Sequence, residues 1–75
     1  MSELEKVERD IATLRGRIRH SRLVLEDPNI TSEAADREHA SLELFGRHMC
    51  ELLTKREDLR SLAEDWAAAL PAIRL

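Results

Sequence analysis

The sequence is poor in the residues that covalent and metal-dependent chemistry require. It contains one cysteine, Cys50, which rules out an intramolecular disulfide and a metal site built from several thiolates. It also lacks a Gly-rich phosphate-binding loop and an HExxH motif. We therefore expect a protein that is not an enzyme, that uses no cofactor and that takes no small-molecule substrate.

Glycine, proline and aromatic residues are scarce as well. The 75 residues include two Gly, two Pro, one Phe, one Trp and no Tyr, whereas 36% are charged and 43% are hydrophobic. This composition is typical of long helices or coiled coils and argues against a β-sheet protein and a disordered chain. A domain this small buries only ~60% of its unfolded surface, so oligomerisation is a common source of additional stability.

Long apolar runs are missing too. No segment approaches the ~20 apolar residues that cross a bilayer, and the first six residues, MSELEK, contain no apolar signal core. The formal net charge of −3 gives the chain no general attraction to polyanions. We expect a cytoplasmic protein that does not bind membranes.

Two stretches carry apolar residues at alternating steps of three and four, the heptad pattern of helices that pack along one another. In the first stretch, Ser2 and Glu5 fit a capping box. The first stretch stops at Asp27-Pro28, because the residue before a proline is disfavoured in the helical conformation. We predict a helix over about residues 2–26. Its core positions are Leu4, Val7, Ile11, Leu14, Ile18 and Leu25, with Ser21 interrupting the series.

The second stretch is longer. Thr31 or Ser32 can cap it, and no stop signal follows before Pro71, so we predict a helix over about residues 32–70 and a short tail over 71–75. Its core positions are Ala35, Leu42, Phe45, Met49, Leu52, Arg56, Leu59, Ala63, Trp66 and Leu70, with Glu38 filling the step between the first two.

The short turn over residues 27–31 makes the two helices antiparallel neighbours. We predict an all-α fold, an antiparallel, coiled-coil-like helical hairpin that forms a single domain over residues 1–75 and assembles into a dimeric helical bundle. Folding about Asn29–Ile30 pairs positions whose numbers sum to about 60. In that register the first turn of the first helix lies opposite Arg56, and no part of the first helix lies opposite the residues after it.

The second helix is therefore predicted to extend past the first, with apolar residues that nothing in the chain covers. An exposed stripe of this size usually marks an interface, and a second copy or another helical protein could cover it. In the alternative, the helix breaks between Lys55 and Arg60 and folds back as a third helix; the lack of Gly and Pro there favours a continuous helix. The predicted interface residues are Leu59, Leu62, Ala63, Trp66, Leu70 and Ile73.

Three polar or small positions within the hairpin can be interpreted in more than one way. Arg56 occupies a core position, where one polar residue can select the register or the oligomeric state, or where the seam simply ends. Gly16 and Gly46 fall at the same level in the predicted register. They indicate a close helix approach, or room for the Phe45 ring, or glycines tolerated on the surface.

A run of basic residues precedes the turn. Arg15, Arg19 and Arg22 share one helical face and could bind phosphates, which would suit a small dimeric regulator that contacts nucleic acid. No aromatic residue accompanies them, and the facing stretch of the second helix is acidic. We therefore favour interhelical ion pairs, in which Arg22 meets Glu38 and Arg17 meets Glu43.

One spacing resembles that of metal ligands. Asp36, His39 and Glu43 lie at i, i+3 and i+7, but they fall outside the core seam and the first helix offers no matching inward carboxylate, as bundle metal sites require. We expect no metal site. The sequence as a whole predicts a small non-enzymatic interaction protein, such as an adaptor, a chaperone-like partner or an assembly subunit, with the nucleic-acid-binding regulator as the alternative.

Overall fold

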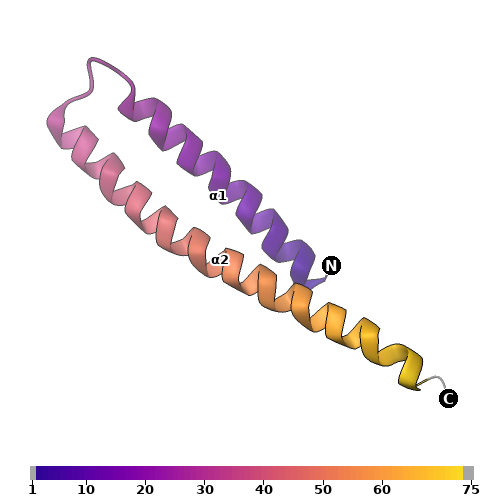
Figure 1. Ribbon diagram of the computed structural model, residues 1–75. Helices are drawn as coiled ribbons and strands as arrows, with labels where there is room; N and C mark the ends of the chain where they lie inside the picture. Colours follow the sequence, from indigo (N-terminus) through magenta and orange to yellow (C-terminus); the bar gives the residue numbers. More distant parts are fainter. Residues whose placement is uncertain (1, 74–75) are drawn as a thin grey trace.

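The chain folds as a helical hairpin. The computed structural model describes the backbone of residues 2–73 and the side chains of residues 2–69, and within these bounds it contains two helices and no strand. Helix α1 spans Glu3–Leu25 and helix α2 spans Ser32–Ile73, and the two lie antiparallel, side by side along α1 (Figure 1). The predicted all-α hairpin is confirmed.

The molecule is a rod. Its principal extents are 68 × 17 × 16 Å and its radius of gyration is 18.7 Å, against ~11 Å for a compact domain of this length. The reason is the unequal length of the helices, 23 residues for α1 and 42 for α2. The end of α2 therefore extends alone past the start of α1 (Figure 1).

Side-chain caps mark where each helix begins. The Ser2 hydroxyl accepts a hydrogen bond from the Glu5 backbone N–H at 3.1 Å, as the capping-box pattern predicts. Of the two residues that could cap the second helix, Thr31 does so, since its Oγ1 accepts from the Ala34 N–H at 3.1 Å. In the turn between the helices, Asp27 Oδ1 accepts from the Asn29 N–H at 2.9 Å, a local bond that is typical of tight turns.

Helix α2 is continuous. It runs from Ser32 to Ile73 without a break near Arg56, so no third helix folds back in the described part of the chain. It also continues through Pro71, although we expected it to end at about residue 70. Only residues 72 and 73 of α2 follow Pro71, although a proline inside a helix removes a backbone hydrogen bond.

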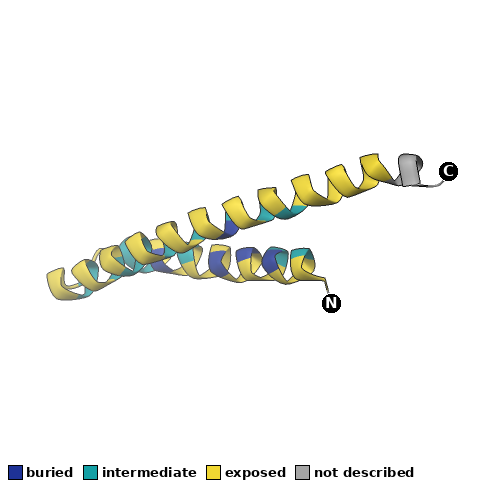
Figure 2. Cartoon of the chain, turned by 90° about the horizontal axis from the view of Figure 1, so that it is seen from below, coloured by how far each residue is buried: buried dark blue, intermediate teal, exposed yellow. Residues whose placement is uncertain are grey.

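The core is small and lies toward the open end of the hairpin. Val7, Ile11 and Leu14 of α1 and Leu52 of α2 are buried, and they occupy the predicted three–four positions. Figure 2 shows the buried positions on the sides of the two helices that face each other, mostly on α1. Partly buried apolar residues packed against them are Ile18, Phe45, Met49, Leu53 and Leu59.

Helix α1 buries residues further along α2 than we predicted from the sequence. Leu59, which we expected to lie beyond the first helix, is half-buried and packs against the core. The two helices keep roughly the predicted register, since Glu3 pairs with Lys55 while Glu8 reaches Arg56 and Arg60, at position sums on both sides of 60. The uncovered part of α2 therefore begins after Leu59.

The two glycines are surface residues. A Cβ atom built at Gly16 or at Gly46 would meet no atom within 4 Å, so neither glycine is needed for a close approach of the two helices. Of the interpretations that the sequence left open, this geometry fits glycines that the hairpin tolerates.

Candidate protein-interaction surface

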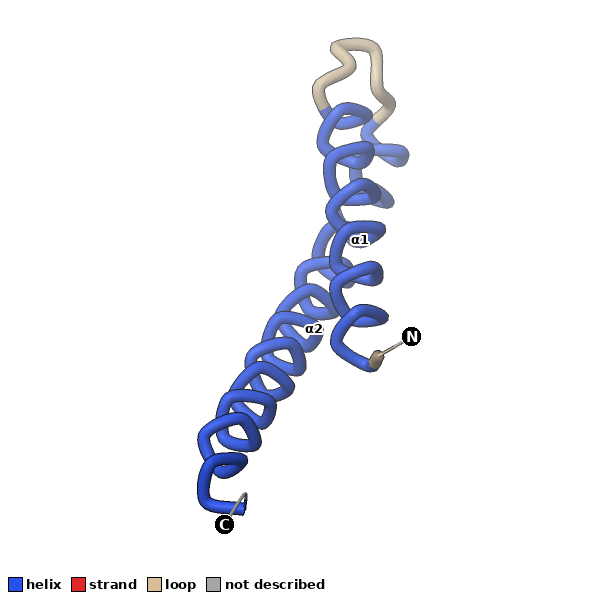
Figure 3. The backbone as a smooth tube through the Cα atoms, turned by 90° about the vertical axis from the view of Figure 1, so that its right-hand side faces the viewer, coloured by secondary structure: helices blue, strands red, loops and turns tan. Residues whose placement is uncertain are grey.

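Beyond Leu59, α2 presents apolar side chains to solvent. Leu62 is 66% exposed and Trp66 is 63% exposed, and Ala63 is exposed between them. Figure 3 shows this segment, residues 61–73, extending past α1 with no neighbouring chain segment; we call it the overhang. The side chains of Leu70 and Ile73, which belong to the predicted interface, lie outside the described residues.

The overhang carries only acidic charge. Glu64 and Asp65 are its charged residues, and no lysine or arginine occurs between Arg60 and Ile73. At ~100° per residue, both carboxylates lie well away from Trp66 around the helix. The overhang thus has an apolar side formed by Leu62 and Trp66, with Glu64 on the opposite side and Asp65 at the border of the apolar side.

A cluster of ion pairs lies beside the first turns of α1. Glu8 Oε1 lies 3.1 Å from Arg60 Nη2 and 4.0 Å from Arg56 Nε, and Lys55 Nζ lies 3.4 Å from Glu3 Oε1. The Arg56 side chain is only 24% exposed. A polar core position is thereby accommodated at the end of the seam, where an arginine can reach a carboxylate of the other helix while its stem covers apolar surface.

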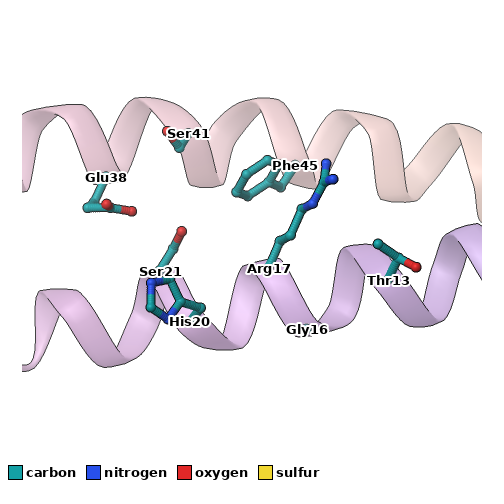
Figure 4. Close-up of a pocket in the computed structure, with 8 residues that line it drawn as sticks. All are labelled: Thr13, Gly16, Arg17, His20, Ser21, Glu38, Ser41 and Phe45. Carbon is teal, nitrogen blue, oxygen red and sulfur yellow. The ribbon is translucent and has the colours of Figure 1, made fainter.

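A shallow groove lies on one side of the hairpin, nearer the turn. It has a volume of about 450 Å³ and opens to solvent. The Phe45 ring and the Ser21 hydroxyl project into it, and the Arg17 side chain crosses it toward α2 (Figure 4). Its lining residues are Thr13, Gly16, Arg17, His20 and Ser21 of α1 and Glu38, Ser41 and Phe45 of α2.

The groove continues toward the open end of the hairpin. A second depression of about 240 Å³ shares Thr13 and Arg17 with the first and adds Asp10, Leu14 and His48. The two depressions form one groove between α1 and α2, which we call the interhelical groove. Leu44 is 62% exposed on α2, one residue before Phe45.

The basic residues of α1 do not form the ion pairs that we predicted. Among the described side chains, Arg22 does not pair with Glu38 and Arg17 does not pair with Glu43; Glu43 instead pairs with Arg47 of its own helix at 3.1 Å. The prediction was wrong because the interhelical pairs gather at the other end of α1, around Glu3 and Glu8. Arg15, Arg19 and Arg22 are exposed on α1.

Other kinds of site find little support in the described part of the chain. No group of three or more His, Cys, Asp or Glu side chains there is arranged to hold a metal ion, Asp36, His39 and Glu43 included. Cys50 is an exposed free thiol. No described helix is apolar over a stretch long enough to cross a bilayer.

Comparisons with protein families, with curated proteins and with solved structures found no match. Function is therefore inferred from the side chains and their arrangement alone. Sequence reasoning located the overhang, because its apolar residues continue the seam of α2. It missed the interhelical groove and the exposed Leu44, for which the one sequence signal was an apolar residue next to the seam rather than in it.

Proposed function

We propose that the chain is a small non-enzymatic protein–protein interaction module that self-associates through the overhang. The observation that carries this proposal is the exposure of Leu62 and Trp66 on a rigid helix that α1 does not reach. Burying a large apolar side chain stabilises an assembly by about 1.5–3 kcal/mol. Tryptophan is also among the residues that dominate binding energy at protein interfaces.

The total surface of the molecule supports an assembled state. Its accessible area is 6157 Å², whereas a compact monomer of this mass exposes ~4,700 Å². A specific interface typically buries ~800 Å² on each partner. The isolated hairpin thus exposes roughly 1,450 Å² more surface than its mass requires, which is more than an interface of ordinary size would remove from one chain.

Light scattering over a hundredfold range of concentration tests this proposal. We expect the wild-type chain to be a dimer, and Trp66→Ala to weaken it at least tenfold in Kd, about 1.4 kcal/mol. Leu23→Ala is the matched control, because Leu23 is similarly exposed, at 59%, but lies on α1 away from the overhang. A wild-type chain that remains monomeric throughout would contradict the proposal.

A second function, contact with nucleic acid, is favoured by one observation. Arg15, Arg19 and Arg22 are exposed, and none of the ion pairs among the described residues involves them. At i, i+4 and i+7 they share one face of α1. Arginines in such a row can contact successive phosphates.

The salt dependence of binding to a DNA duplex tests this alternative. If each arginine contacts a phosphate, replacing all three by alanine lowers the slope of log K against log salt by about 2.7. Replacing Arg37, Arg47 and Arg60 of α2 together is the control and leaves the slope largely unchanged. Equal losses in both triple variants, or no binding by the wild type, would contradict a nucleic-acid face on α1.

A further inference from the structure

We propose that the overhang of one copy docks on the interhelical groove of a second copy, so that two antiparallel chains each supply one overhang and one groove. This inference rests on the proposed self-association and names the surface that receives the overhang. The segment that docks on the groove is residues 61–73 of another copy of this chain.

The first observation is that the groove and the apolar side of the overhang lie along the same side of α2. Eighteen residues make five turns of an α-helix, so residues that far apart have the same direction. Ser41 and Leu59 form one such pair, Leu44 and Leu62 a second, and His48 and Trp66 a third. Ser41 and His48 line the groove.

This alignment permits a closed, symmetric arrangement. When two copies of α2 run antiparallel with these sides facing, each overhang lies over the groove of the other copy. One two-fold axis relates both contacts, so the assembly ends at two chains. Overhangs that paired only with each other would leave both grooves and both Leu44 side chains exposed.

Leu44 is the second observation. Among the described side chains of α2, the exposed large apolar residues are Leu44, Leu62 and Trp66, and all three lie on this side of the helix. Trp66 of one copy would lie over the groove between Gly16 and Phe45, and Leu62 would lie near its rim. Leu44 at that rim has no intramolecular role, because it is 62% exposed in the hairpin.

Charge is the third observation. The overhang carries acidic residues only, Glu64 and Asp65, whereas α1 has no acidic residue between Asp10 and Glu26. Over that span α1 carries four arginines, of which Arg17 lines the groove together with His20. The groove lining also includes Glu38 and Asp10, so the complementarity is between the acidic overhang and the positive charge of α1 over this span, which favours the antiparallel encounter.

Substitution of Leu44 separates this inference from self-association alone. We expect Leu44→Lys to weaken the dimer at least tenfold by light scattering, while His39→Lys, at an exposed position five residues earlier and so on the other side of α2, changes Kd less than twofold. Circular dichroism of both variants checks that helicity is retained. If Trp66→Ala weakens the dimer and Leu44→Lys does not, the overhang is an interface but does not dock on the groove. If neither substitution weakens the dimer, the proposed self-association through the overhang is wrong as well.

Crosslinking locates the contact directly. In a Cys50→Ser background, chains with Ser41→Cys are mixed with chains with Ala69→Cys and treated with a short thiol crosslinker; we expect the mixed pair to dominate. The control replaces the Ser41→Cys chain with the wild type, whose Cys50 lies nine residues on and so on the opposite side of α2. Crosslinks that join mainly two Ala69→Cys chains, or that form equally with Cys50, would overturn the proposed docking.

Discussion

At the scale of single residues, the hairpin contains positions that cost stability without an intramolecular reason. Gly46 lies in the middle of α2, where glycine is less favourable than alanine by about 0.5–1 kcal/mol. A Cβ atom there meets no other atom within 4 Å. Its position, five residues after Ser41, places it away from the groove side of α2.

We therefore predict that Gly46→Ala stabilises the fold by about 0.5–1 kcal/mol and leaves the dimer Kd unchanged. Urea denaturation of the variant and the wild type at equal protein concentration measures the first effect, and light scattering the second. A destabilised variant would show that Gly46 has a packing role that the open space around it does not reveal.

Glu8 is the residue that joins the start of α1 to the far part of α2. It faces two arginines, and its side chain is 42% exposed, as against 68% for Glu43 in the pair that it forms with Arg47. Exposed ion pairs contribute at most ~1 kcal/mol and less when fully solvated. Glu8 also holds Arg56 at a core position of the seam.

We predict that Glu8→Gln costs about 0.5–1 kcal/mol of unfolding free energy and Glu43→Gln only a few tenths, about 0.3 kcal/mol. Thermal unfolding at low salt measures both. The difference between the variants should shrink in ~1 M salt, where charges are screened within ~3 Å. Equal losses in the two variants would show that Glu8 is not a special contact.

At the scale of the helices, the stability of the hairpin depends on very few side chains. Val7, Ile11, Leu14 and Leu52 are the buried apolar residues in the described part of the chain. In proteins, most helical stability comes from the packing of an apolar face against another element rather than from the helix itself. The loss of one core side chain should therefore affect the whole hairpin.

We predict that Ile11→Ala lowers the unfolding free energy by about 2–4 kcal/mol, because Ile11 is 2% exposed. Far-ultraviolet circular dichroism during urea denaturation measures the loss. Leu23→Ala, at an exposed site, should change it by less than about 0.5 kcal/mol. Similar losses for both would contradict a core on the Ile11 side of α1.

The helices were predictable from sequence because their signals are local and agree with one another. The three–four spacing of apolar residues, the Ser2 and Thr31 caps and the Asp27-Pro28 stop all act within a few residues of each other. The ion pairs were not predictable, because long side chains reach several partners and each pair contributes little. The cover of Leu59 was not predictable either, because a long side chain just past the start of α1 can still pack against the core.

At the scale of the whole molecule, the rod shape follows from one fact of the sequence, that a second heptad pattern outlasts the first. The position of the overhang along α2 was predictable, since the apolar residues without a partner on α1 could be counted off from the turn. The groove was not, because it depends on how far apart the helices lie at Gly16 and Phe45. Such spacing arises from the packed side chains rather than from the pattern.

The measurement that tests the central claim most directly follows Trp66 during dilution. Trp66 is the single tryptophan of the chain and is 63% exposed in the isolated hairpin, so its emission reports whether the overhang is covered. We predict short-wavelength emission at high concentration and a shift to longer wavelength over the same dilution range in which light scattering shows the mass halving. Emission typical of an exposed tryptophan at every concentration, together with a monomer mass, would contradict the account.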